Sequence, residues 1–312
     1  MANTYGKVSG TFEEVTNIYG KVSGTWEEVD EAYAKVSGTW EQVFAAFVAT
    51  SFVTLSSGSS TFVVPQGANA LHVQAAAGGG GGGYRGADYD KAGGESAGAG
   101  GGSGAYVSDK IFTVTEGETI SYSIGTAGAG GTGGLYSGTA GSGTSTTLSG
   151  SSAGSLFTLT GGGGASAASG GVQGPLRTNT AGTAGSATIS GTVVTSGTFK
   201  DSAGVTQNVI GNTSGPTGVF NSSGNGATGS NNGNCGGDNC QIAGSNGAAS
   251  FNGSIAGGVG TPTGGQSPGG TGTRGSGGGG GGAQWNSPYG GNTIGGAGGA
   301  GQIIYRFLRV SP

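Results

Sequence analysis

Residues 71–83, LHVQAAAGGGGGG, join the two kinds of sequence that make up this chain. Their first part alternates apolar residues with His72 and Gln74, as a strand with one buried face does. Their second part is a run of six glycines, residues 78–83, and glycine dominates the sequence from there to Gly301. The stretch predicts a β-strand that leads directly into a glycine-rich region. On this strand His72 is expected to be half-exposed, without a catalytic or metal-binding role.

Further strand-like pieces frame the glycine-rich region on both sides. Most are rich in β-branched and aromatic residues and are bounded by Gly, Pro or Ser. They are residues 51–55, 61–64, 70–75, 105–107, 110–114, 119–124, 155–159 and 302–310. A flexible linker has no need of a closing apolar strand. The frame of about residues 50–124 and 302–310 therefore predicts a folded, all-β domain.

The composition excludes a side-chain core of ordinary size for a chain of this length. The chain has 79 Gly and 7 Pro among 312 residues, a content that by itself indicates low complexity or disorder. Disordered chains usually carry a high net charge, whereas this one has 8% charged residues and a net charge of −4. If the glycine-rich region is folded, backbone contacts must therefore hold it together.

The glycines recur at intervals of three, as in the series Gly125, Gly128, Gly131 and Gly134. A polyproline II-type helix has three residues per turn, so this spacing lays glycine along one edge, where a neighbouring backbone can approach closely. The Gly-X-Y register breaks every few turns and proline is scarce, which argues against a collagen triple helix. We expect a bundle of short polyglycine II helices over about residues 78–301. The alternative is a flexible Gly/Ser linker.

A repeat of 14 residues occurs three times in residues 1–47, at 5–15, 19–29 and 33–43. The spacing of its apolar residues by three and four also fits a helical heptad. A helix, however, would hold two glycines in each early copy, at about 1 kcal/mol apiece. A hairpin with Ser-Gly at its turn uses the glycine well and keeps each side chain on one face of a sheet. We favour a β-meander for residues 1–47, followed by one glycine-rich domain at 48–312.

Several functional classes lack their chemistry here. The eleven Lys and Arg residues are scattered, which argues against nucleic-acid binding. The single histidine has no catalytic motif around it, no Gly-Lys-Ser/Thr triplet occurs, and Asp88, Asp90 and Glu95 are mixed with basic residues. We expect no enzyme, no cofactor and no metal. Cys235 and Cys240, the only cysteines, are expected either to form a small-loop disulfide or to stay unpaired.

Four pieces of the sequence carry a family resemblance: residues 62–65 (FVVP), 71–83, 112–125 (FTVTEG with YSIG) and 298–305 (GGAGQIIY). Together they resemble the glycine-rich domain of phage tail-fibre proteins over roughly residues 50–312. From Gly78 onward the chain is similar to the tip adhesin of T-even-type long tail fibres. The 14-residue repeats resemble Lys-Val-x-Gly-x-Trp hairpin modules of phage tail proteins and replace the fibre-docking domain of that adhesin.

The resemblance implies a stack of polyglycine II helices whose variable turns at one end touch a host receptor, either a polysaccharide or an outer-membrane protein. Exposed rings beside amide and carboxylate groups suit such contacts, although the same rings also fit a role as caps on the glycine bundle. The expected receptor-binding residues are Tyr84, Arg85, Tyr89, Tyr136, Phe199, Asn232, Asp238, Trp285 and Tyr289. The residues expected to attach the chain to the virion are Tyr5, Phe12, Tyr19, Trp26, Tyr33 and Trp40.

The function expected from these residues is that of a phage tail-fibre or tail-tip adhesin. Its partners would be other tail proteins and the host receptor, and it would be a trimer or be mounted on a trimeric fibre. It has no evident secretion signal or apolar membrane span, so we expect it to be made in the host cytoplasm and to reside in the virion tail. The alternatives are a purely structural tail component and an ice- or surface-binding protein on a polyglycine II scaffold.

Overall fold

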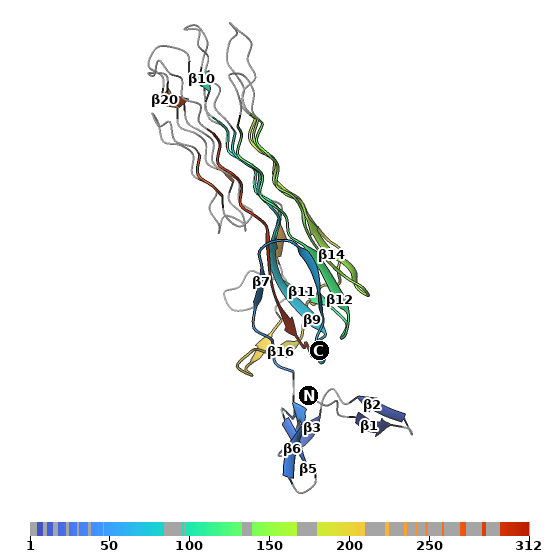
Figure 1. Ribbon diagram of the computed structural model, residues 1–312. Helices are drawn as coiled ribbons and strands as arrows, with labels where there is room; N and C mark the ends of the chain where they lie inside the picture. Colours follow the sequence, from blue (N-terminus) through green and yellow to red (C-terminus); the bar gives the residue numbers. More distant parts are fainter. Residues whose placement is uncertain are drawn as a thin grey trace.

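The computed structural model describes the chain in a series of ranges, and its strands are numbered as in Figure 1. The described residues are 5–8, 11–14, 18–22, 25–29, 31–36, 39–45, 47–83, 95–96, 98–132, 139–166, 180–209, 222–224, 234–235, 241–242, 247–248, 258, 269–272, 283–284 and 294–311. These residues form strands, turns and extended segments, and no helix occurs among them. The part of the chain that the structure describes is therefore all-β.

Two five-stranded antiparallel sheets pack face to face. The first has the order β18 (Ser222–Gly224), β11 (Tyr106–Thr113), β9 (Ala70–Ala76), β22 (Gln302–Leu308) and β7 (Val53–Leu55). The second has the order β15 (Ala187–Ile189), β14 (Gly154–Leu159), β13 (Thr146–Gly150), β12 (Thr119–Ser123) and β8 (Ser59–Val63). Strand β22, near the end of the chain, lies between β9 and β7 and pairs with both.

The main core lies between these sheets. Alternate residues of β9 and β22 face it, among them Leu71, Val73, Tyr305 and Phe307. Phe62 of β8 reaches across from the second sheet and stacks on the Tyr305 ring, with a centroid separation of 4.2 Å and an interplanar angle of 7°. This alternation of buried residues is the reason that these pieces form strands in this register.

The opposite face of the first sheet is also covered. A small hairpin of β16 (Thr198–Lys200) and β17 (Thr206–Asn208) lies there, and Phe199 is buried with Ile111 and Leu308 in a second apolar cluster. Residues 47–52 run across the same face as a strap. The amide of Ala49 donates to the Lys200 carbonyl at 2.9 Å, and that of Thr50 donates to the Phe307 carbonyl at 3.1 Å.

The two five-stranded sheets form a sandwich, and glycine-rich segments extend several of its strands away from it (Figure 1). Residues 77–83, 125–132 and 160–166 leave it after β9, β12 and β14. Residues 98–105, 139–145, 180–186 and 294–301 return to it before β11, β13, β15 and β22. The chain therefore leaves the sandwich and returns to it several times on the same side.

Backbone hydrogen bonds around residues 77–83 repeat with a period of three. Amides three residues apart donate to the same neighbouring segment, and the next amide along donates to a different one. The bonds are Ala77 to Ala105, Gly80 to Gly102 and Gly83 to Ala99 in one direction, Gly78 to Thr144 and Gly81 to Gly141 in a second, and Gly79 to Gly299 and Gly82 to Gly296 in a third. Two more segments donate back to residues 77–83, through the amides of residues 128 and 131 and of 162 and 165.

Glycine is required where these segments touch. A Cβ atom on Gly81 would overlap the carbonyl oxygen of Ala129, and one on Gly78 would overlap the carbonyl oxygen of Thr126. The backbones approach until their amides and carbonyls bond directly, so the glycine segments are held by backbone contacts in place of a side-chain core.

The N-terminal repeats form hairpins, as the even spacing predicts. The three hairpins are β1 (Tyr5–Val8) with β2 (Thr11–Glu14), β3 (Tyr19–Val22) with β4 (Thr25–Glu28), and β5 (Glu31–Val36) with β6 (Thr39–Ala45). The strands of different hairpins do not pair as in a meander, because each hairpin is a separate two-stranded sheet among the described strands.

Candidate functional site

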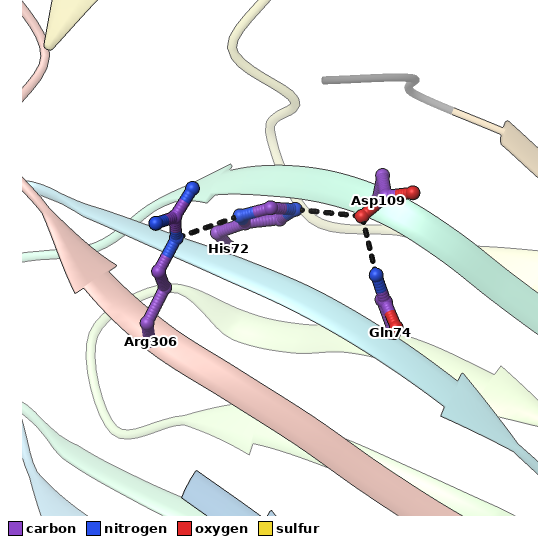
Figure 2. Close-up of polar contacts among 4 residues, drawn as sticks. All are labelled: His72, Gln74, Asp109 and Arg306. Carbon is purple, nitrogen blue, oxygen red and sulfur yellow. Dashed lines mark hydrogen bonds and ion pairs between the residues drawn. The ribbon is translucent and has the colours of Figure 1, made fainter. Parts of the chain in front are cut away.

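Two places are candidates for function: a cluster of charged side chains on the first sheet, and the far end of the glycine segments. Figure 2 shows the charged cluster. Strand β9 supplies His72 and Gln74, β11 supplies Asp109, and β22 supplies Arg306, which lies directly opposite His72 in the strand register. The alternation of β9 that sends Leu71 and Val73 into the main core places His72 and Gln74 on the other face.

Hydrogen bonds link the four side chains in a row. Arg306 donates from Nε to Nδ1 of His72 at 3.1 Å. The Nε2 atom of His72 lies 3.0 Å from Oδ1 of Asp109, and Gln74 donates to the same oxygen at 2.6 Å. Because an arginine nitrogen can only donate, Nδ1 of His72 must accept. The neutral ring therefore carries its proton on Nε2 and donates it to Asp109.

Asp109 occupies a special backbone position. Its φ of 56° is the only positive φ among the described residues other than glycine. It lies where the β9–β11 register shifts between Val107 and Lys110. Aspartate tolerates this left-handed conformation better than most residues, and a bulge of this kind re-aims one side chain. The bulge turns Asp109 toward His72.

Aromatic rings cover the cluster. The ring of Phe52 meets His72 edge-on at a centroid distance of 5.4 Å. The guanidinium carbon of Arg306 lies 4.5 Å from the Phe52 centroid and 5.4 Å from that of Phe199. Contacts of a cation with two rings hold Arg306 in place and shield the cluster from water. The strap and the β16–β17 hairpin, which supply these rings, are thereby fixed to the sheet.

Burial and hydrogen bonds together set the ionisation of the pair. Removal of His72 from water lowers its pKa below the ordinary value, and the hydrogen bond and charge of Asp109 offset this only in part. Burial acts to raise the pKa of Asp109, but the hydrogen bonds from His72 and Gln74 outweigh it and keep the pKa below its usual range. A neutral histidine thus lies beside an ionised aspartate.

The expectation that His72 is half-exposed was wrong. Its exposed fraction is 2%, because residues 47–52 and the β16–β17 hairpin cover the face that the local alternation assigns to solvent. Both ring nitrogens are engaged in hydrogen bonds, so neither offers a lone pair to a substrate. The arrangement suits a structural tie between three strands.

Most of the residues expected to bind a receptor lie next to glycine segments or short strands in the sequence. Tyr84 follows Gly83 directly in the sequence, and Trp285 follows Gln284. Eight of the expected residues lie outside the described part of the chain: Tyr84, Arg85, Tyr89, Tyr136, Asn232, Asp238, Trp285 and Tyr289. Their side chains are therefore known only by their places in the sequence.

Short strand pairs connect the segments that flank these residues. Strand β10 (Glu95–Ser96) pairs with β19 (Asn234–Cys235), and β20 (Gln241–Ile242) pairs with β21 (Ala283–Gln284). In Figure 1, β10 and β20 lie at the end of the molecule away from the sandwich. The pairs bring together stretches that lie far apart in the sequence. Cys240 lies outside the described residues, so its pairing with Cys235 stays a prediction.

The remaining expected residues are described in part. Phe199 is 3% exposed, because it fills the second apolar cluster beneath Arg306. Its burial removes it from the set expected to contact a receptor. Tyr33 and Trp40 are exposed on the third hairpin, whereas Tyr5, Phe12, Tyr19 and Trp26 have strand positions but no described side chains. Within the described ranges no three His, Cys, Asp or Glu side chains gather as metal ligands.

The glycine-rich domain profile matches residues 54–308, which is most of the sequence. The chain belongs to the glycine-rich domain family. The matched region of this glycine-rich domain begins at Thr54 of β7 and ends at Leu308 of β22, and these two strands pair with each other. The hairpins precede the matched region. A comparison with curated proteins finds no match to the sequence. No helix long and apolar enough to cross a membrane occurs in the described residues.

The charged cluster was not predicted from the sequence, although one signal for it existed. Ser108 and Asp109 separate two apolar pieces, at residues 105–107 and 110–114, that belong to a single strand, β11. A bulge inserts an extra residue into a strand and can re-aim a side chain, so a polar interruption of this kind is compatible with one. The contact between Arg306 and His72 could not be predicted from any local signal, because the two residues lie 234 positions apart in the sequence.

Proposed function

We propose that this chain is a phage tail adhesin that holds receptor-binding loops at the end of a polyglycine II scaffold. The observation that carries the proposal is the three-residue period of the hydrogen bonds around residues 77–83. A helix with three residues per turn directs successive amides about 120° apart, and so toward different neighbours. Residues 77–83 bond to five surrounding segments, with successive amides directed to different ones. Packed helices with three residues per turn produce this pattern.

Chain direction supports the placement of the loops. Residues 77–83 lead outward and residues 98–105 return, so the stretch between them joins their outer ends. The same holds for residues 133–138 and 167–179. Residues 285–293 precede a returning segment. These connections contain aromatic and Asn or Asp residues, among them Tyr89 and Tyr136. A rigid scaffold with variable loops at one end is a common arrangement for recognition.

The proposal includes no catalytic activity. His72, the single histidine, has both ring nitrogens bonded and lies under Phe52. The chain would act by binding, would reside in the virion tail and would contact other tail proteins through its N-terminal hairpins. The exposed ring of Trp40 on the third hairpin is consistent with such a contact.

Adsorption of the purified full-length chain to host cells tests the proposal. One variant combines Trp285→Ala with Tyr289→Ala, and a second combines Tyr84→Ala with Tyr89→Ala. Loss of an aromatic anchor at a binding surface typically weakens affinity by a factor of about 30. The matched control is Val205→Ala, because Val205 is 55% exposed in the turn between β16 and β17, at the sandwich end.

We expect at least one distal pair to reduce cell binding by about tenfold or more, whereas the control binds as the unsubstituted chain does. Wild-type protein that neither adsorbs to host cells nor blocks infection would overturn the adhesin function. It would favour a purely structural tail component.

A further inference from the structure

The three N-terminal hairpins share one cross-strand arrangement. Directly opposite positions pair a lysine with an aromatic residue: Lys7 with Phe12, Lys21 with Trp26, and Lys35 with Trp40. The next pair toward each turn is a valine opposite a threonine in all three hairpins. Residues directly opposite each other project from the same face, and neighbouring pairs project from opposite faces. The register thus places the lysine and aromatic positions of each hairpin on one face, called here the lysine–aromatic face, and the valine and threonine positions on the other.

In the third hairpin the lysine–aromatic face is open to solvent. Trp40 is 67% exposed and Lys35 is exposed. Lys21, the equivalent of Lys35 in the second hairpin, is exposed too. A large ring exposed beside a lysine is typical of a binding surface, since burial of the ring against a partner removes apolar area from water.

An isolated two-stranded hairpin is marginally stable in water. Each of these three hairpins is a two-stranded sheet of its own among the described strands, and none joins the sandwich. Side chains of a partner that cover the lysine–aromatic face would supply the burial that the hairpins lack.

The short connections limit what the partner is. Strand β2 ends at Glu14 and β3 begins at Tyr19, so at about 3.4 Å per residue these ends lie at most about 17 Å apart. The corresponding limit between Glu28 and Glu31 is about 10 Å. Hairpins held this close together can occupy identical sites only if those sites are also close together. The subunits of a symmetric oligomer place identical sites close around the symmetry axis, whereas separate proteins spread along a tail do not.

We propose that the hairpins are three equivalent binding units for one homo-oligomeric protein with at least three copies of the same site. Each site would accept the aromatic ring in an apolar recess and place an acidic group beside the lysine. Binding by three weak units raises the local concentration of the second and third, so the attachment is tight without any single strong contact. The inference rests on the proposed function, which makes residues 1–47 the attachment to the tail.

The test uses the full-length chain, fixed sparsely to a sensor, and tails purified from particles assembled without this chain. One hairpin is disabled by Lys35→Thr with Trp40→Val, and the others by Lys21→Thr with Trp26→Val and by Lys7→Thr with Phe12→Val. Threonine and valine favour strands, so these substitutions keep the strand propensity of the changed positions. The matched control changes the opposite face at all three hairpins: Thr11→Ala, Thr25→Ala and Thr39→Ala.

We expect the tails to dissociate about tenfold faster when any one hairpin is disabled and about a hundredfold faster when any two are, with no binding when all three are disabled. The control variant should dissociate as the wild type does. Complete loss through one particular hairpin, with no effect of the other two, would overturn the proposal. So would an equal effect of the control, or a wild-type chain that does not bind the tails.

Adsorption to host cells separates this inference from the proposed function. All hairpin variants should bind cells as well as the wild type, because the distal loops are unchanged. A chain that binds cells but not tails would refute the hairpin proposal and leave the adhesin function standing. A chain that binds tails but not cells would refute the adhesin function and leave the hairpin proposal standing.

Discussion

Arg306 donates a hydrogen bond from Nε to Nδ1 of His72 at 3.1 Å, across 234 residues of sequence. The bond joins the last strand of the sandwich to the strand that leads into the first glycine segment. It also determines the histidine tautomer, because the acceptor nitrogen cannot carry the proton. Together with Asp109, it fixes strands β9, β11 and β22 to one another at the base of the glycine segments.

Asp109→Asn should lower the pKa of His72 further. The hydrogen bond and the negative charge of Asp109 both raise that pKa, against the larger effect of burial. The asparagine removes the charge while it tolerates the positive φ at this position. His72 is the only histidine in the chain, so a titration of its imidazole protons by NMR measures the pKa without assignment. An unchanged or higher pKa would show that Asp109 does not interact with the ring as described.

Acid should destabilise the fold through His72. The pKa of His72 in the folded state lies below its value in the unfolded chain, which is about 6.5. As the pH falls below that value, the unfolded chain binds the proton first, so the free energy of unfolding decreases until the folded pKa is reached. His72→Gln, which keeps a donor and an acceptor, should lose less stability than the wild type between about pH 7.5 and 5.5. Urea unfolding at both pH values measures this; parallel losses would contradict it.

Phe199→Ala should affect stability and leave receptor binding intact. Phe199 is buried beside Ile111 and Leu308, and its ring lies under Arg306. Truncation of a buried phenylalanine typically costs about 3–5 kcal/mol. Thermal unfolding should show this loss, whereas adsorption of the folded variant to cells should equal that of the wild type. Weaker adsorption at a temperature where the variant is fully folded would show that Phe199 does contribute to receptor binding.

Gly81→Ala should disrupt the glycine segments. The added Cβ would overlap the carbonyl oxygen of Ala129, and overpacking of this kind costs about 1–3 kcal/mol or more. The matched control is Ala129→Ser on the other side of the same contact, where the side chain is exposed. Its effect on urea unfolding should lie within about 0.5 kcal/mol. Equal stability of the two variants would show that the backbones do not meet at Gly81.

The sequence predicts the strands that carry apolar alternation. Residues 70–75 and 302–310 supply two of the three interior strands of the first sheet, because their alternate residues fill the main core. Strands β13 and β15 were not predicted. They consist mostly of Thr, Ser, Ala and Gly with a single large apolar residue each, and they become strands because neighbouring strands supply their hydrogen bonds.

The charged cluster shows the limit of local reasoning more sharply. The face on which His72 lies follows from alternation, but its burial depends on the strap at residues 47–52 and on Phe199. These covering residues belong to other parts of the chain, and no local pattern links them to β9. The contacts of the glycine segments, in contrast, involve only the backbone, so a local pattern can predict them. The period of three in the sequence corresponds to the period of three in the hydrogen bonds.

Amide hydrogen exchange in the glycine segments tests the central claim most directly. If backbone bonds hold these segments together, the amides of Gly79, Gly80, Gly81 and Gly82 should exchange as slowly as those of β9, since each donates to a neighbouring carbonyl at 2.8–2.9 Å. Protection should extend to the amides of Gly128, Gly162 and Gly298. Exchange of all these amides at the rate of an unfolded chain, with β9 still protected, would contradict the scaffold and leave a flexible glycine linker in its place.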